Sequence, residues 1–157
     1  MNAGTLARVT EPDQLAPPGR GIVVFGWVAN GLFAVTAIPV ALGADVEIGV
    51  AIGVALVLFL VAVGTFVYAF AVGLARSARG DNVAVANLFF LQGSAPKRVQ
   101  RDFLFLFLAC LAITVGTAAW EPFGVLVPML PLGLAGVWGA RYGTFPRRPP
   151  VAGRRRV

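Results

Sequence analysis

Side chains that could carry out acid–base, nucleophilic or metal chemistry are scarce in this sequence of 157 residues. Histidine is absent, and the single cysteine, Cys110, lies in a long apolar run. A serine–histidine or cysteine–histidine nucleophile pair is therefore excluded, and no set of Cys and His exists to ligate zinc, haem or an iron–sulfur cluster. The sequence predicts no catalytic residue, no cofactor and no metal ion.

The acidic residues are scattered along the chain, and none interrupts an apolar run: Glu11, Asp13, Asp45, Glu47, Asp81, Asp102 and Glu121. An ionisable group inside a bilayer is costly and usually marks function, so its absence is informative. We interpret Asp81, Asp102 and Glu121 as helix-cap or interface residues. The lack of buried charge argues against a proton-coupled transporter, a pump or a voltage sensor that works as a monomer.

One polar side chain in an apolar run, that of Asn30, is a candidate intramembrane contact. Its amide has two donor hydrogens and an acceptor oxygen that need partners in hydrocarbon. One interpretation is a single interhelical hydrogen bond, and the other is contact with a substrate or ion. The remaining polar residues at depth are expected to bond their own helix backbone, and they are Thr36, Thr65, Thr114 and Thr117.

The composition predicts an all-α integral membrane protein. Apolar residues make up 58% of the chain before its 19 glycines are added, charged residues only 13%, and the mean hydropathy is +0.82. About 20 apolar residues cross a bilayer as a helix. Four segments meet this requirement, at 21–44, 48–75, 103–120 and 123–140. The first is longer than a signal-peptide core, which favours an uncleaved anchor.

The connection at 76–102 contains a second apolar stretch, 83–91, that is too short to span. We expect an interfacial segment lying on the membrane between the second and third spans. A re-entrant dip and docking on a partner remain alternatives. Ser94 is predicted to cap the third helix. Pro128 and Pro131 are predicted to kink the fourth, and the recurrent small residues of the spans suit close helix contacts.

All 13 Lys and Arg residues fall on one side of a four-span layout. The positive-inside rule therefore predicts that both termini and the middle loop are cytoplasmic, and that the protein is a multi-pass inner (plasma) membrane protein. We divide the chain into a flexible tail (1–20), a four-helix transmembrane domain (21–142) and a basic Pro/Arg-rich tail (143–157). Topology accounts for the net charge of +6, so a nucleic-acid partner is not expected.

Three basic residues at the foot of the third span, Lys97, Arg98 and Arg101, are candidate contacts for anionic lipid headgroups. Their simpler role is to set topology, which the positive-inside rule alone explains. Beyond lipids, a larger membrane protein or a second copy of the chain is a candidate partner.

The stretches 88–99 (LFFLQGSAPKRV) and 133–146 (GLAGVWGARYGTFP) resemble uncharacterised small integral membrane proteins of actinobacteria. The resemblance implies the same four-span layout and no activity. We expect a non-enzymatic membrane protein that acts as an accessory, scaffold or assembly subunit through helix–helix and lipid contacts. The alternative is a component of a small oligomeric channel or transporter, and a membrane enzyme ranks third.

Overall fold

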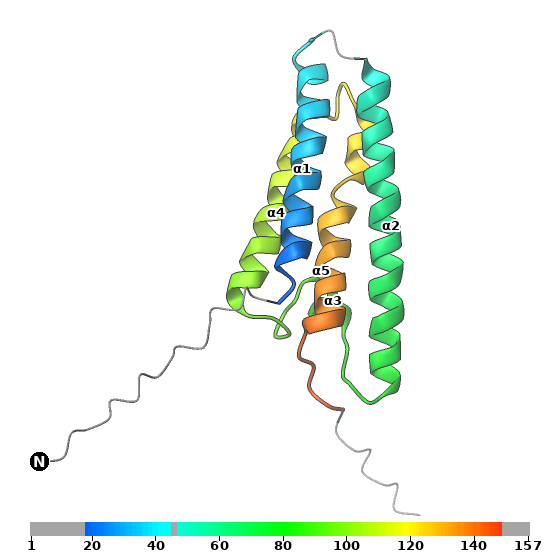
Figure 1. Ribbon diagram of the computed structural model, residues 1–157, viewed down its shortest axis with the longest axis vertical. Coiled ribbons are helices and arrows are strands. Elements are labelled where there is room, and N and C mark those ends of the chain that lie inside the picture. Colours follow the sequence, from blue (N-terminus) through cyan, green and yellow to red (C-terminus); the bar gives the residue numbers. More distant parts are fainter. Residues whose placement is uncertain (1–17, 45–46, 149–157) are drawn as a thin grey trace, which may run out of the picture.

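The computed structural model describes residues 18–44 and 47–148, which form an all-α bundle (Figure 1). Its elements, in chain order, are α1 (Arg20–Ala41), α2 (Ile48–Ala78), α3 (Val85–Phe89), α4 (Lys97–Thr117), the 3₁₀ helix η1 (Pro122–Leu126) and α5 (Met129–Tyr142). Within these residues, α1, α2, α4 and the combined segment Pro122–Tyr142 are long and apolar enough to cross a membrane. The predicted four-span integral membrane protein is confirmed.

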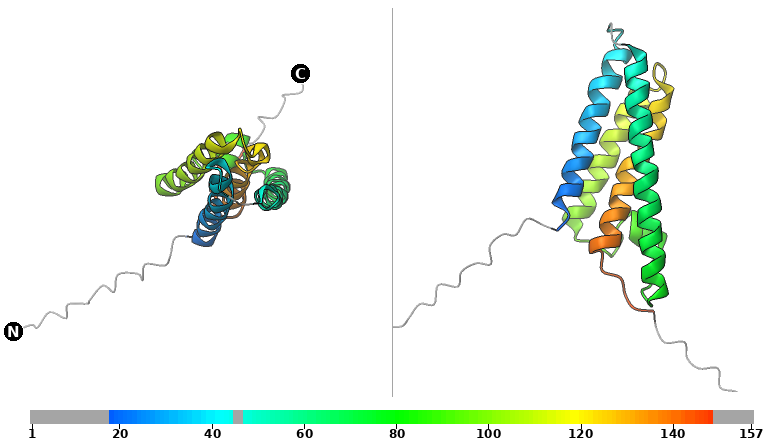
Figure 2. Two further views of the ribbon diagram at one scale, coloured as in Figure 1. Left: turned by 90° about the horizontal axis from the view of Figure 1, so that it is seen from above. Right: turned by 45° about the vertical axis from the view of Figure 1, so that its right-hand side comes forward.

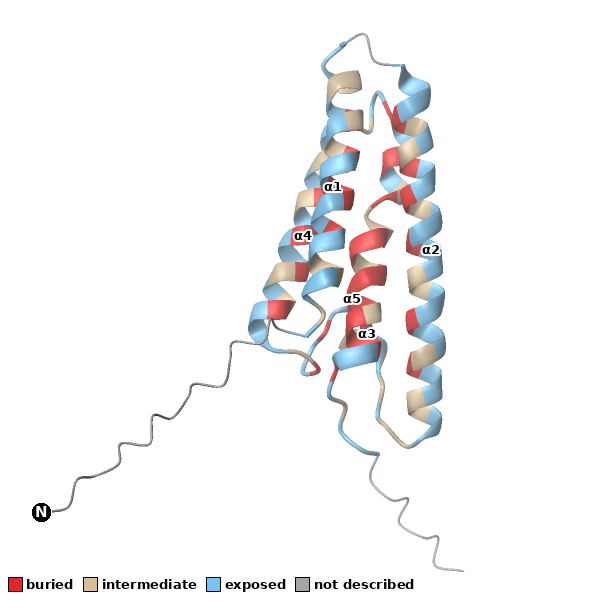
Figure 3. Ribbon diagram, viewed as in Figure 1, coloured by how far each residue is buried: buried red, intermediate tan, exposed pale blue. Residues whose placement is uncertain are grey.

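The helix α5 is the central element of the bundle. It lies between α2 on one side and α1 and α4 on the other (Figures 1 and 2). Nine of its 14 residues are buried, against six of 31 in α2, and the buried residues of the other helices face it (Figure 3). The main apolar core is formed where these inner faces meet, around Phe33, Leu106 and Leu130.

Close packing around α5 depends on its three glycines, Gly133, Gly136 and Gly139. A Cβ atom added to Gly139 would lie 2.5 Å from the backbone carbonyl oxygen of Leu88, and one added to Gly136 would lie 2.6 Å from the ring of Phe89. Real Cβ atoms do not approach other atoms so closely, so only glycine fits here. The predicted small-residue contact is confirmed for α5, whereas Cβ atoms on Gly49, Gly53 and Gly116 would meet nothing within 4 Å.

The predicted interfacial segment contains α3, which packs against the bundle. Leu88 and Phe89 are buried, and the Phe89 ring stacks on Phe66 of α2 with centroids 4.3 Å apart. Val85 and Phe90 remain exposed on the outer side. Part of the apolar surface of 83–91 is thus covered by the chain's own α2 and α5.

The fourth span is divided into two pieces at Pro128, where the sequence predicts only a kink. Pro128 is the N-cap residue of α5, and Pro131 lies in the first helical turn, where a missing N–H costs no hydrogen bond. At 14 residues α5 is about 21 Å long, and the five residues of η1 add about 10 Å. The two pieces together match a hydrocarbon core of about 30 Å.

The predicted cap of α4 is wrong. The N-cap residue is Pro96, without a side-chain hydrogen bond, and the Ser94 hydroxyl donates instead to the carbonyl oxygen of Asn87. Ser94 is buried, and its own carbonyl accepts a 3.0 Å hydrogen bond from the backbone N–H of Thr144. The α3–α4 connection is thereby tied to the chain that follows α5.

The basic residues described by the structure gather at one end of the bundle, which we call the basic end. It also holds the described chain ends, Pro18 and Arg148 (Figure 1). The opposite end, the turn end, contains the α1–α2 and α4–η1 connections. The other basic residues, and most of the two predicted tails, lie outside the described residues.

Candidate functional site

Asn30 lies on the buried face of α1, and its amide joins that helix to α4. The Nδ2 group donates a 2.9 Å hydrogen bond to the backbone carbonyl oxygen of Leu106, and the side chain is almost fully buried. The Oδ1 atom has no hydrogen-bond partner. The geometry favours the interhelical interpretation of Asn30, because the only partner of its amide within the described residues is another helix of the same bundle.

The predicted hydrogen bond from each threonine hydroxyl to the backbone of its own helix is confirmed for three of the four threonines. The hydroxyls of Thr36, Thr65 and Thr117 donate to carbonyl oxygens of their own helices. Thr114 differs, because its hydroxyl donates across the bundle to the carbonyl oxygen of Gly124 in η1, at 3.2 Å. It therefore joins α4 to the first piece of the divided fourth span.

Glu121 departs most from its sequence-based interpretation. It occupies the N-cap position of η1, but its side chain makes no capping hydrogen bond and is completely buried. Among the residues that the structure describes, neither carboxylate oxygen has a hydrogen-bond partner. The prediction that no ionisable group is buried, which argued against proton-coupled functions, is therefore wrong for Glu121.

The composition of the α4–η1 turn could have indicated this burial. Residues 118–123 read Ala-Ala-Trp-Glu-Pro-Phe, so the glutamate is the only charged side chain in a short connection without Gly, Ser or Asn. Such a turn has little polar surface with which to face water. Helical periodicity does not extend into a turn, so the direction of the side chain could not be predicted.

The arginines of α2 and α5 are held by contacts within the chain. Arg76 forms an ion pair with Asp81 at 3.0 Å and donates a 3.1 Å hydrogen bond to the carbonyl oxygen of Ala140. Arg141 donates to the Tyr68 hydroxyl at 3.2 Å. These side chains therefore take part in packing at the basic end.

The three basic residues of α4 are in a different situation. Lys97, Arg98 and Arg101 are exposed. Their side chains make no hydrogen bond or ion pair with another residue in 18–44 or 47–148. Arg98 also lines an open cavity of about 370 Å³ together with Arg20, Asp102 and the buried Trp138. Two arginines beside an apolar wall can accept an anionic headgroup and the first part of its lipid chain.

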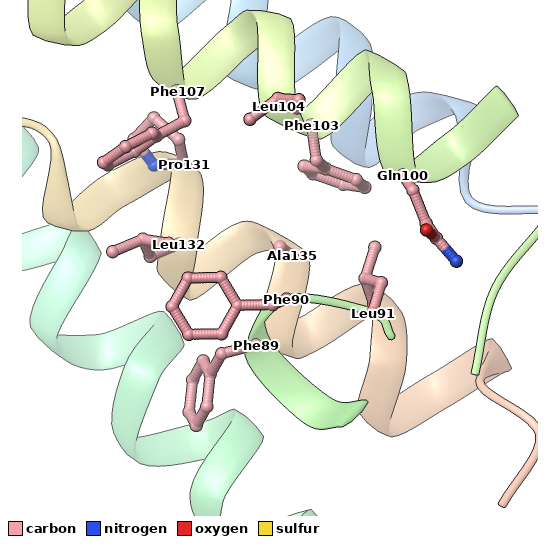
Figure 4. Close-up of a pocket in the computed structure, with 10 residues that line it drawn as sticks. All are labelled: Phe89, Phe90, Leu91, Gln100, Phe103, Leu104, Phe107, Pro131, Leu132 and Ala135. Atoms are coloured by element: carbon pink, nitrogen blue, oxygen red, sulfur yellow. The ribbon is translucent and has the colours of Figure 1, made fainter. Parts of the chain in front are cut away.

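An apolar groove opens between α3, α4 and α5 (Figure 4). It holds about 140 Å³, and its walls include Phe89, Phe103 and Phe107. Gln100 lies at the edge, where its amide donates a 2.8 Å hydrogen bond to the carbonyl oxygen of Ala95. No ionisable side chain lines the groove, so it can hold apolar groups but offers no acid–base chemistry.

The described residues contain no group of three or more His, Cys, Asp or Glu side chains that could hold a metal ion. No protein-family model, curated protein or solved structure matches the chain. The resemblance to small actinobacterial membrane proteins stays a prediction.

Replacing Asn30 with leucine should lower the free energy of unfolding by about 1 kcal/mol, because the α1–α4 hydrogen bond is lost. Denaturant titration of the purified protein in detergent measures this change. Thr36→Val is the matched control, since the Thr36 hydroxyl bonds only within α1 and its loss should have little effect. Equal stability of wild type and Asn30→Leu would show that the Asn30 amide contributes nothing to the bundle.

Replacing Lys97, Arg98 and Arg101 together with glutamine should weaken the binding of anionic lipid by about five-fold per charge removed. Native mass spectrometry of the protein with defined lipids measures the bound fraction. The control variant carries glutamine at Arg79, Arg147 and Arg148, which removes the same charge from the same end. If both variants lose lipid equally, the α4 cluster has no special role and only the overall charge matters.

Proposed function

We propose that the protein lies in the cytoplasmic (inner) membrane with its basic end in the cytoplasm. Nine of the Lys and Arg residues fall within the described chain, and all of them are at the basic end: Arg20, Arg76, Arg79, Lys97, Arg98, Arg101, Arg141, Arg147 and Arg148. The described parts of the turn end carry none. Cationic segments are retained on the cytoplasmic side during insertion, which supports this orientation.

We further propose that the protein is a non-enzymatic accessory, scaffold or assembly subunit. The observation that carries this proposal is the distribution of apolar surface. In the most hydrophobic windows of α1, α2 and α4 only 28%, 22% and 28% of residues are buried, against 61% in Pro122–Tyr142. Three spans therefore present most of their surface to lipid or to other helices, while Asn30 and the threonines at depth bond inside the chain.

A component of an oligomeric channel or transporter is the second candidate. The buried carboxyl of Glu121 favours it, because ionisable groups away from water commonly lie on ion or proton pathways. The core of a single copy is filled by apolar side chains, so any conducting path would have to form between copies.

The orientation predicts that a reporter active only in the cytoplasm will be active when fused after Val157. The reason is that both described chain ends, Pro18 and Arg148, lie at the basic end. Activity measured in intact cells checks this. The same reporter inserted between α1 and α2 should be inactive, and the reverse pattern would place the basic end outside and contradict the proposal.

The accessory role predicts that gentle detergent extraction will recover the protein with a larger membrane protein in fixed stoichiometry. Mass measurement of the intact complex gives that ratio, because helix–helix contacts survive in mild detergent. A closed ring of identical copies would instead support the channel or transporter candidate. Recovery of the protein only as a single copy with lipid would contradict both.

A further inference from the structure

The α4–η1 turn directs the side chain of Glu121 into the bundle. The backbone N–H of Glu121 donates a 2.9 Å hydrogen bond to the carbonyl oxygen of Thr117, which continues the last turn of α4. Its own carbonyl accepts a 3.3 Å hydrogen bond from the N–H of Gly124 as η1 begins. With both backbone groups fixed, the side chain is held at 0% exposure.

The carboxyl group is enclosed by apolar atoms. A Cβ atom added to Gly124 would lie 2.5 Å from Oε2 of Glu121 and 2.9 Å from Cζ of Phe33, so the glycine leaves the room that the carboxyl occupies. The nearby hydroxyls cannot serve as donors without losing other bonds. Thr114 already donates to the carbonyl of Gly124, and Thr117 to that of Ile113.

Within residues 18–44 and 47–148, no positive charge faces this carboxyl. The described Lys and Arg residues are at the basic end, and the 21 residues of α4 separate that end from the turn by about 30 Å. This is well beyond the screening length of about 8–10 Å in physiological salt. Among the described residues, the other titratable groups of the packed elements include the Cys110 thiol on α4 and Glu47, which is exposed beside the first turn of α2. Asp102 of α4, Tyr142 of α5 and Tyr68 of α2, which contacts Arg141, lie toward the basic end.

An ionised carboxylate in these surroundings would be buried, unpaired and without hydrogen bonds, which is the least favourable state for such a group. The neutral acid avoids this cost. We propose that Glu121 is a proton-binding site, at which the carboxylate takes one proton from the aqueous phase on the turn side and keeps it while the α4–η1 turn is closed. On release of the proton, the carboxylate moves toward water and the turn opens.

The electrostatics of the site agree with this assignment. Burial raises the pKa of Glu121. The backbone N–H groups of Gly124 and Phe123 lie near the carboxyl without meeting hydrogen-bond geometry, and they lower its pKa only in part. The closed bundle thus binds a proton more tightly than the opened or unfolded chain does. The stability contributed by this group is fully present at acid pH, and it is lost as the pH rises through the raised pKa. The inference holds for either orientation of the protein.

The test uses the full-length protein reconstituted in lipid. A hydrophobic carbodiimide modifies carboxyl groups in their protonated form, so it should label Glu121 at neutral pH. Labelling should fall about ten-fold for each pH unit above the pKa of the site. Infrared spectra should show a carboxylic-acid carbonyl band that titrates over the same range. Glu47→Gln, which removes an exposed acid from the same end, should leave both signals unchanged.

Glu121→Gln is the decisive variant because glutamine has the size of the neutral acid and cannot lose a proton. It should fold, lack the infrared band and the label, and keep an unfolding midpoint that does not fall as the pH is raised. The proposal is overturned if Glu121→Gln keeps the pH dependence of the wild type, or if the wild-type carboxyl is ionised at neutral pH. Stabilisation by Na⁺ or K⁺ that requires Glu121 would also overturn it, because the ligand would then be a metal cation.

Discussion

The bundle depends on the distance at which the backbone of α5 passes α2 and the α3 segment. Lipid is as apolar as the helices, so their association relies on van der Waals contact between well-matched surfaces. The glycines of α5 permit that contact, and the carbonyl oxygen of Leu88 occupies the space that a side chain at Gly139 would need. Once α5 is fixed in this position, its remaining face completes the core with Phe33 and Leu106.

A second constraint acts on every polar atom at depth, because hydrocarbon offers no water as an alternative partner. The bundle meets it through short bonds to backbone carbonyls, as for Asn30 and Thr114. Among the described residues, the buried side-chain atoms without a partner are Oδ1 of Asn30 and both oxygens of Glu121. The two residues differ in one respect. The amide is neutral at every pH, whereas the carboxyl becomes neutral only by taking a proton, so of these two residues only Glu121 can make the fold respond to pH.

The layout of the spans could be predicted because it rests on length and hydropathy, which are properties of single segments. The division at Pro128, the bonding of Ser94 and the direction of the Glu121 side chain could not be predicted, because each depends on what another part of the chain places nearby. Ser94, for example, has the right residue type and spacing for a helix cap, yet the carbonyl of Asn87 competes successfully for its hydroxyl. The inward direction of Asn30 was open to prediction, since it lies in a helical run, but its partner Leu106 was not.

The division of the fourth span and the burial of Glu121 are connected. An uninterrupted α-helix from Pro122 would rise about 1.5 Å per residue, whereas the 3₁₀ geometry of η1 rises about 2 Å with three residues per turn. In that geometry the carbonyl oxygen of Gly124 accepts the hydrogen bond from the Thr114 hydroxyl. The Cα of Gly124 lies next to the carboxyl group of Glu121. Pro128 favours this arrangement because it has no N–H group with which to donate an α-helical hydrogen bond to the carbonyl oxygen of Gly124. The break that divides the fourth span therefore also forms the enclosure around Glu121.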